Sequence, residues 1–483
     1  MNSPNIVLVV MDTACANEII PQNAPNITDI AKSGTQFSNT FATAPWTLPS
    51  HAGLFTGTYS SKHGAHAGHK QLNGRLATLG ETFHSASYET IAISNNTWIN
   101  DEFGFGQGFK TFYKTWQYLQ SDVDLTETIR KTEGWGKIQA VASEIIGGNP
   151  FINFVNAAYR KFVRKSDDYG AKRTNRWISN WLDDRDTHRP FLLFVNYLEP
   201  HLEYQPPKAH AERFLPDGCP FEEAMEVPQD AWGYIAGNVE MSESDFEILR
   251  ALYRAEISYL DQRIGELRDE LIERGEWEDT VFVVTGDHGE NIGDHGLMDH
   301  QYCLYDTLLH VPLVINGGPF EGGGTVDDLV QLVDLAPTLL DVADIDAHEM
   351  RAQFQGQSFH PDADPTRDHV IAEYMAPQPS MDALEKRVGT LPESVRTYDR
   401  SLRAIRTEDH KLIRGSDGSR ECYRIGEDPK ETTDCSNEDP DWASTLEADL
   451  DDWLGSFEHA TVDGSVAMKD DTKRQLEDLG YLQ

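Results

Sequence analysis

Two segments of the chain place carboxylates and an imidazole directly after apolar runs. Residues 6–11 are followed by Asp12, and residues 281–285 lead to Asp287 and His288. Hard carboxylate oxygens with one imidazole nitrogen suit a divalent cation such as Ca, Mg, Mn or Zn. A single Asp after a strand is more often a cap or turn residue than a ligand. The three side chains together predict a site for one divalent metal.

A third segment adds a hydroxyl at the start of a helix. Pro49 suits the first residue of a helix that runs to about Gly57, which leaves Thr47 at the amino end. A hydroxyl there lies close to unpaired backbone N–H groups and the positive end of the helix dipole, which favour an alkoxide and an attacking anion. Capping alone also explains a threonine at this point. Thr47 is a candidate nucleophile, and the motifs in the rest of the chain must decide between this role and capping.

The segments that must position these side chains alternate between apolar runs and amphipathic stretches. The apolar runs are short, as strands covered on both faces are, and lie at residues 6–11, 91–94, 191–196, 281–285 and 311–315. Residues 245–274 carry leucine and isoleucine at helical spacing among charges. This alternation predicts an α/β fold with a large, mainly parallel sheet flanked by helices on both faces. Ligands in such folds bind at the carboxyl edge of the strands.

The last quarter of the chain follows another pattern. Strand-like runs separated by turn residues precede a helical stretch, at residues 370–374, 402–406, 411–414, 422–425 and 442–457. They predict a small antiparallel sheet with a helix. We therefore expect a catalytic domain at residues 1–380 and a C-terminal subdomain at residues 381–483.

Residues 118–175 are expected to form a helical insertion in the catalytic domain. Within it, residues 151–165 combine aromatic and aliphatic side chains with four basic ones, which is unusual in so acidic a chain. Such a segment could cover the site, bind an anionic substrate or make a peripheral contact with a membrane surface. A plain amphipathic packing helix is the favoured interpretation.

The chain of 483 residues is strongly acidic. It has 80 acidic against 41 basic residues and a formal charge of −39, which argues against nucleic acid as a partner. The 39% hydrophobic and 10% aromatic content argues against disorder. A dispersed carboxylate excess with few lysines suits a surface solvated in concentrated salt, and we predict a halophilic source. An acidic solubility surface in an ordinary cell is the alternative.

Targeting and cysteine patterns point to a cytoplasmic protein. No stretch approaches the ~20 apolar residues of a membrane span, and the amino terminus lacks a basic region followed by a small-residue cleavage site. The five cysteines are scattered without C-x-x-C spacing. We expect neither a zinc knuckle nor a disulfide framework.

The order of motifs resembles the sulfatase family of the alkaline phosphatase superfamily over most of the chain. The matching segments are the opening strand with Asp12, residues 24–31, the Thr47 helix ending Phe55-Thr56-Gly57, His63-Gly64, Pro200-His201, residues 285–290 with 293–296, residues 310–313, 333–338 and 403–414. A single match would be weak, but the whole series occurs in register. The resemblance implies a sulfatase-like fold and a metal-dependent ester hydrolase.

Several positions depart from the sulfate-cleaving members of that family. Those members carry Cys or Ser in a C-x-P-S-R motif, where it is oxidised to formylglycine, whereas this chain has Thr47 and, at the Arg position, His51. A secondary alcohol cannot give the aldehyde, so we expect no formylglycine. The usual second Asp is Thr13, residues 94–97 lack the Lys and His of the family's G-K-W-H segment, and a later Lys falls at His300 or Gln301.

These departures resemble the phosphate-handling branches of the superfamily. Lipoteichoic acid synthases and phosphoethanolamine transferases hold one metal with an acidic residue, a Thr, an Asp and a His. That quartet maps onto Asp12, Thr47, Asp287 and His288. Two-metal phosphodiesterases add a D-x-x-x-H pair, which we do not find in the expected region, so one metal is preferred.

The resemblance implies in-line attack by Thr47 on phosphorus, with a covalent phospho-threonine that water or a second alcohol resolves. His201 could protonate the leaving oxygen, although a structural histidine is the alternative, and His300 could stabilise the equatorial oxygens. His51 and Asn95 are the substrate-binding candidates. The expected substrate is a phosphate mono- or diester or a phosphonate, either a small molecule or a glycan- or lipid-linked anionic ester.

Three further interpretations stay open. The chain could be a sulfuric ester hydrolase, a transferase of the phosphoethanolamine or glycerophosphate type, or a non-catalytic binding protein on the same fold. The intact quartet of Asp12, Thr47, Asp287 and His288 argues against the last of these.

Overall fold

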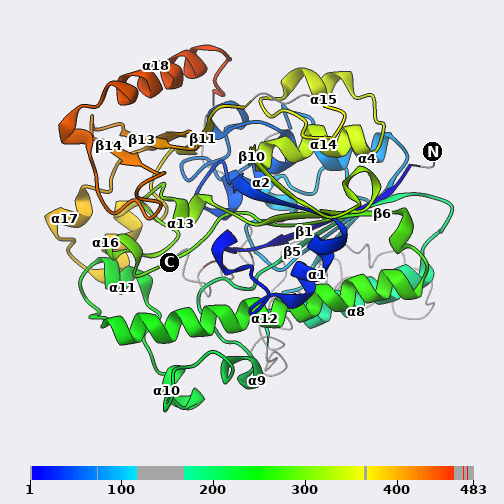
Figure 1. The fold of residues 1–483 in the computed structure, drawn as a ribbon, viewed down its shortest axis with the longest axis horizontal. Helices are drawn as coiled ribbons and strands as arrows, with labels where there is room; N and C mark the ends of the chain where they lie inside the picture. The colour runs from blue at the N-terminus through cyan, green and yellow to red at the C-terminus, as the bar shows by residue number, and fades with distance from the viewer. Residues whose placement is uncertain are drawn as a thin grey trace, which may run out of the picture.

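A mixed sheet of eight strands forms the centre of the molecule in the order β10-β2-β9-β6-β1-β5-β3-β4 (Figure 1). This computed structural model describes residues 3–72, 74–116, 168–363 and 367–461, with residues 472 and 476. The strands are β1 (Asn5–Met11), β2 (Thr35–Phe41), β3 (Glu89–Ser94), β4 (Thr111–Lys114), β5 (Phe191–Tyr197), β6 (Thr280–Gly286), β9 (Leu313–Asn316) and β10 (Thr325–Gln331).

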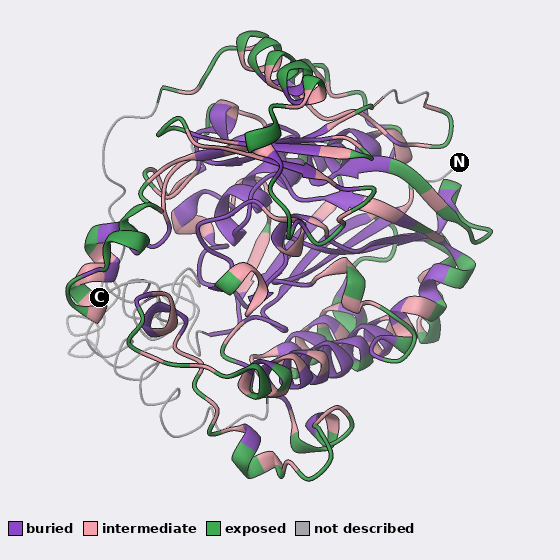
Figure 2. Cartoon of the chain, turned by 60° about the vertical axis from the view of Figure 1, so that its left-hand side comes forward, coloured by how far each residue is buried: buried purple, intermediate pink, exposed green. Residues whose placement is uncertain are grey.

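The central strands run parallel and are covered on both sides. β1 pairs in parallel with β5 and with β6, and every residue of these three strands is buried. β9 is antiparallel to its neighbours β2 and β6. The prediction of a large, mainly parallel sheet is therefore confirmed. Figure 2 shows these buried strands at the centre of the chain.

Helices lie on both faces of the sheet. α1 (Pro25–Ser33), α8 (Ala171–Asp184) and α12 (Glu243–Glu273) cover the lower face in Figure 1. α2 (Thr47–Thr56), α4 (Leu79–Ser85), α14 (Leu335–Val342) and α15 (His348–Gln353) lie above it. α12 begins with a capping box, in which Ser242 and Asp245 satisfy each other's backbone N–H groups. Its bounds agree closely with the amphipathic stretch at residues 245–274.

The C-terminal part adds a second sheet. β11 (Val370–Tyr374), β12 (Leu402–Arg406), β13 (His410–Gly415) and β14 (Arg420–Arg424) are antiparallel in that order. α18 (Asp441–Gly455) packs on it through Leu446 and Leu450, which join a cluster with Ile405 and Leu412. The predicted small sheet with a helix is confirmed. Since β11 precedes residue 380, this sheet begins before the predicted domain boundary.

The predicted insertion at residues 118–175 lies mostly outside the described residues. Its basic segment at residues 151–165 lies wholly outside them, and α8 begins at Ala171. Among the residues that the structure describes, no helix combines the length and the apolar character needed to cross a membrane. All five cysteines are described, and each is a free thiol.

Candidate active site

Parallel pairing brings the two acidic segments to one edge of the sheet. Met11 of β1 lies opposite Gly286 of β6, so Asp12 and Asp287 both follow the carboxyl ends of adjacent strands. His288 Nε2 lies 3.4 Å from Asp287 Oδ2 and 3.8 Å from Asp12 Oδ1. All three side chains are fully buried.

Thr47 lies beside this group as the first residue of α2. Its Oγ1 is 3.3 Å from His288 Nε2 and 3.5 Å from Asp12 Oδ1. The sequence predicted Pro49 as the first residue of the helix, but the helix begins two residues earlier, at Thr47, and Pro49 is its third residue. Thr47 therefore stands at the end where backbone N–H groups have no partner within the helix. An anion bound next to Thr47 would meet the positive end of the helix dipole.

The carboxyl groups of Asp12 and Asp287 lie close together in the core, where burial disfavours their charged forms. Backbone N–H groups of Thr13 and His288 donate to Asp287 Oδ1, whereas Oδ2 is buried and accepts no hydrogen bond. Burial raises the pKa of Asp12 to about 7, and burial together with the charge of Asp12 raises that of Asp287 well above its ordinary value.

This donor set fits a divalent cation. One ligand atom from each of Asp12, Asp287 and His288 lies within 4.8 Å of the others. A cation held there would neutralise the two buried carboxylates and satisfy the free Asp287 oxygen. Oxygen and imidazole ligands are compatible with Ca, Mg, Mn or Zn.

His51 lies on the far side of Thr47, inside the core. Its fully buried ring packs edge-on against Phe105 and Phe194. Nδ1 lies 2.9 Å from the Thr47 carbonyl oxygen and 3.4 Å from Asp287 Oδ2. Burial lowers the pKa of His51 to about 4, so the ring is neutral near pH 7. Contact of His51 with substrate stays a prediction, and its buried position favours support of Asp287.

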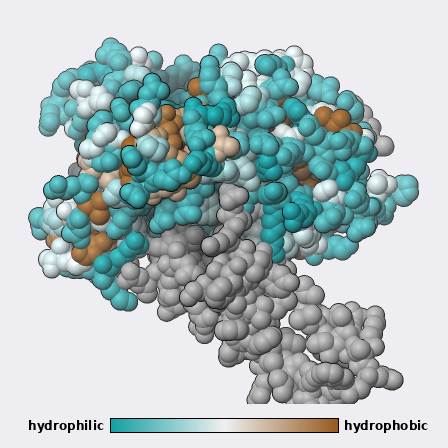
Figure 3. Space-filling model, turned by 90° about the horizontal axis from the view of Figure 1, so that it is seen from below, coloured by the Kyte–Doolittle hydropathy of each residue, from teal (hydrophilic) through white to brown (hydrophobic). Residues whose placement is uncertain are grey.

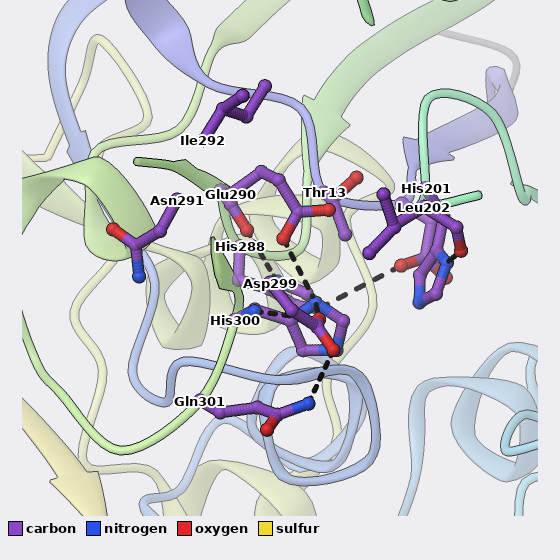
Figure 4. Close-up of polar contacts among 12 residues, drawn as sticks. Thr13, His201, Leu202, His288, Glu290, Asn291, Ile292, Asp299, His300 and Gln301 are labelled. Atoms are coloured by element: carbon purple, nitrogen blue, oxygen red, sulfur yellow. Dashed lines mark hydrogen bonds and ion pairs between the residues drawn. The ribbon is translucent and has the colours of Figure 1, made fainter. Parts of the chain in front are cut away.

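His201 and His300 lie next to the metal-ligand group. The His300 ring is 4.5 Å from that of His288 and 5.1 Å from that of His201, measured between centroids. Figure 4 shows Glu290 and Asp299 against His300, with His201 nearby. Burial alone would lower the pKa of His300, but the two carboxylates outweigh it and raise that pKa well above its ordinary value.

His201 has the opposite electrostatic environment. Burial and the neighbouring His300 lower the pKa of His201 to about 4. Its Nδ1 donates to the Leu202 carbonyl oxygen. The structure thus places His300 beside His288, and His201 beside His300.

Asn96 is a site residue that the sequence did not identify. Its Nδ2 donates to Asp12 Oδ2 at 2.5 Å and lies 3.5 Å from Thr47 Oγ1. The predicted residue, Asn95, instead accepts hydrogen bonds from Thr115 and Thr174. The two asparagines follow β3 directly, so the sequence located the segment but not the side chain that reaches Thr47.

The sequence analysis also did not identify Asp299 and Glu290 as site residues. One feature of the sequence could have indicated them: Glu290 and His300 lie at the two ends of a short, turn-rich segment. If that segment forms a hairpin, as it does here, its two ends come together.

A model of the sulfatase family, described as "Sulfatase", matches residues 4–345 of the chain. Curated relatives agree with that match. An uncharacterized sulfatase of Escherichia coli, YidJ, is 26% identical over 368 residues, which cover 72% of this chain and 70% of YidJ. The choline-sulfatase of Rhizobium meliloti is 24% identical, with 77% of this chain and 74% of the relative covered.

Solved structures share the fold over nearly the whole chain. A phosphonate monoester hydrolase of Agrobacterium radiobacter superposes with a TM-score of 0.67 at 21% identity, covering 94% of this chain and 95% of that one. The protein BT4656, solved with D-glucosamine-2-N,6-O-disulfate as its substrate, gives the same TM-score at 18% identity and covers 94% and 98%.

Proposed function

The chain belongs to the sulfatase family, and on that premise we propose that it is a metal-dependent hydrolase that cleaves phosphate mono- or diesters or phosphonate esters through Thr47. The observation that carries the proposal is an unmodified threonine hydroxyl at the position of a nucleophile. Thr47 Oγ1 lies within 3.5 Å of both Asp12 and His288, at the amino end of α2. Threonine cannot become formylglycine, so Thr47 cannot use the aldehyde-hydrate chemistry of the sulfate-cleaving members.

The proposed reaction begins with attack by Thr47 Oγ1 on phosphorus. A divalent cation on Asp12, Asp287 and His288 would lower the pKa of the attacking hydroxyl and polarise the phosphorus oxygens. The Oγ1–P bond forms as the bond from phosphorus to the leaving oxygen breaks, and the hydroxyl proton leaves to solvent. Water then attacks the phospho-threonine and regenerates the free hydroxyl.

Surrounding side chains have separate proposed parts in this reaction. Asn96 Nδ2 lies 3.5 Å from Thr47 Oγ1 and donates a hydrogen bond to Asp12, so it fixes the position of the nucleophile relative to the carboxylate. His300, whose pKa Asp299 and Glu290 raise, stabilises the equatorial oxygens of the phosphoryl group. His201 protonates the leaving oxygen once the negative charge of the bound ester offsets the burial and the His300 charge that lower its pKa to about 4. The N–H groups of the first turn of α2 favour the negative charge of the bound ester.

Sulfate ester hydrolysis is the second candidate, because the curated relatives carry sulfatase names. Sulfate and phosphate share a tetrahedral shape, and BT4656 binds a sulfated glucosamine. Without formylglycine, a sulfated Thr47 would be an ordinary alkyl sulfate that is slow to hydrolyse. Phosphorus esters are therefore expected to react faster. A second alcohol in place of water would make the same site a transferase.

A substrate screen with matched variants tests the proposal. We expect 4-nitrophenyl phosphate, bis(4-nitrophenyl) phosphate or 4-nitrophenyl phenylphosphonate to be turned over faster than 4-nitrophenyl sulfate by the metal-loaded protein. Thr47→Ser should retain turnover and Thr47→Ala should lose it. Thr56→Ala is the matched control, because the hydroxyl of Thr56, in the same helix, forms its hydrogen bonds within the described chain with Ala52 and Thr58 and not with the site.

Trapping the intermediate identifies the nucleophile directly. Acid quenching during turnover should leave a phosphoryl or phosphonyl adduct, located by mass spectrometry on the peptide that contains Thr47. A sulfate ester as the best substrate by a wide margin, or wild-type turnover by Thr47→Ala, would contradict the proposal even though the fold is right.

A further inference from the structure

A two-stranded hairpin carries His300 to the active site. β7 (Asn291–Ile292) pairs antiparallel with β8 (Met298–Asp299), and Asn291 lies opposite Asp299. Glu290, directly before β7, therefore lies next to His300, directly after β8. Because β7 begins three residues after His288, the hairpin fixes the position of His300 relative to that proposed metal ligand.

Two carboxylates from this hairpin hold one edge of the His300 ring. Nδ1 lies 2.5 Å from Asp299 Oδ1 and 3.3 Å from Glu290 Oε1 (Figure 4). Gln301 donates to the second oxygen of Asp299, so this carboxylate is itself held in place. Glu290 Oε2 is buried and accepts no hydrogen bond in the structure. With Nδ1 engaged on both sides, the ring cannot rotate about its side-chain bonds without losing these contacts.

The backbone supports the same arrangement at a conformational cost. Asp299 has a φ of +72°, in the left-handed region that residues with a side chain seldom occupy. Its Oδ1 also accepts the backbone N–H of His300 at 2.7 Å. Residues in such conformations concentrate at functional sites, where the surrounding structure compensates for the strain.

Stability alone does not explain three ionisable side chains buried in so short a hairpin. Glu290, Asp299 and His300 are all less than a tenth exposed. Burying an ionic cluster is often no more stabilising than apolar residues of similar volume, because desolvation offsets the attraction. A cluster that orients a reacting side chain accounts for the arrangement. Partners behind catalytic and metal-bound histidines act in this way in other proteins.

We propose that Asp299 and Glu290 are positioning residues that clamp Nδ1 of His300 and so present the opposite edge of its ring to the substrate. The inference rests on the proposed contact of His300 with the phosphoryl group and names the residues that make it effective. Both carboxylates act only through His300. Their effect on turnover should therefore disappear when the imidazole is absent.

A double-mutant cycle measures this dependence. Asp299→Asn should lower kcat by about 10- to 100-fold, the usual loss for an outer partner of an active-site histidine. Asparagine keeps the side-chain size and tolerates a positive φ, so the backbone can stay as it is. His300→Ala should lower kcat by about 100-fold or more. In the His300→Ala background, Asp299→Asn should change kcat by less than about 2-fold.

Controls separate positioning from damage to the hairpin. Asp294→Asn changes a carboxylate in the same hairpin, which among the described residues accepts a hydrogen bond only from the backbone of Ile292, and it should leave kcat unchanged. Bound metal per chain and the melting temperature are measured for every variant. Glu290→Gln repeats the cycle from the other side of His300 and should show the same dependence.

The outcomes distinguish this inference from the proposed function. Equal losses from Asp299→Asn in both backgrounds, or no loss in either, would overturn the positioning role. So would a loss that merely follows reduced metal content or folding. Full turnover by Thr47→Ala would contradict the proposed nucleophile. The coupling between Asp299 and His300 could still be measured in that case, from the kcat values of the double-mutant cycle.

Discussion

At the scale of single residues, the site is defined by short polar contacts among groups that burial makes costly. Asn96 joins Asp12 to Thr47, and His51 lies between the Thr47 carbonyl and Asp287. Both residues follow strands of a parallel sheet, whose carboxyl ends lie at one edge, and this was enough to predict that Asp12 and Asp287 lie close together. It could not tell Asn95 from Asn96, because the direction of a side chain in a loop depends on dihedral angles that no periodicity encodes.

Removal of either carboxylate should abolish metal binding. We expect Asp287→Ala and Asp12→Ala to lose both the bound divalent metal and turnover, because each supplies a ligand oxygen to a set of only three acidic or imidazole donors. Elemental analysis of the purified proteins, with activity before and after chelation, measures this. Asp261→Asn alters another buried aspartate, which bonds Asn26 and Ile27, and should keep the metal. A fully active, metal-free protein in chelator would refute the metal site.

The two neighbouring asparagines should behave differently. Asn96→Ala removes a side-chain donor that contacts both Asp12 and Thr47, and we expect kcat to fall by about 10- to 100-fold. Asn95→Ala breaks the hydrogen bonds from Thr115 and Thr174, so its main effect should be a lower melting temperature. Steady-state kinetics and thermal melts of both variants decide the matter. A larger loss of kcat from Asn95→Ala would favour the substrate contact predicted from the sequence.

At the scale of elements, the sequence predicts the buried strands better than the partly exposed ones. The fully apolar runs became β1, β3, β5, β6 and β9, because burial on both faces demands such residues. β2, β4 and β10 were missed. β2 mixes Thr, Gln, Ser and Asn with two Phe, and the edge strand β10 carries exposed Asp327 and Asp328. Neither gives the continuous apolar run that identifies a central strand.

A buried ion cluster connects the C-terminal sheet to the catalytic part. Lys411 of β13 is fully buried, and its Nζ lies 2.7 Å from Asp306 of α13 (Asp306–Leu309) and 2.6 Å from Glu431. Burial would lower the pKa of Lys411, but Asp306 and Glu431 outweigh it and raise that pKa. The lysine therefore stays charged. Asp306 also pairs with Arg406 of β12, so the cluster ties α13 to two strands.

Lys411→Met should be strongly destabilising. It leaves buried carboxylates without their shared cation, and we expect a loss of about 3–5 kcal/mol in the free energy of unfolding. Denaturant melts measure it. The same change at Lys208, whose exposed ammonium pairs with Glu222, should alter the melt little. Adding Glu431→Gln to Lys411→Met should restore part of the loss, and a wild-type melt for Lys411→Met would show that the cluster does not hold the two parts together.

At the scale of the whole molecule, the surplus of carboxylates dominates the surface chemistry. The formal charge is −39, and the described face seen from below is mostly hydrophilic (Figure 3). α18 illustrates the pattern, since Asp449, Asp451 and Asp452 are all exposed on it, and within the described part of the chain only Asp451 has an arginine partner, Arg414. Unscreened repulsion among such groups opposes the compact state.

Salt should therefore stabilise the fold by screening. Because the Debye length shrinks from roughly 30 Å at 0.01 M to 3 Å at 1 M, the melting temperature should rise steeply at low salt and then level off. Salts that act by exclusion from the surface instead continue to stabilise at molar concentrations. Thermal melts in NaCl, against a neutral osmolyte at equal osmolality, separate the two effects. The double variant Asp449→Asn/Asp452→Asn should raise the melting temperature at low salt and leave it unchanged at high salt. A melting temperature independent of salt would leave the halophilic interpretation of this charge without support.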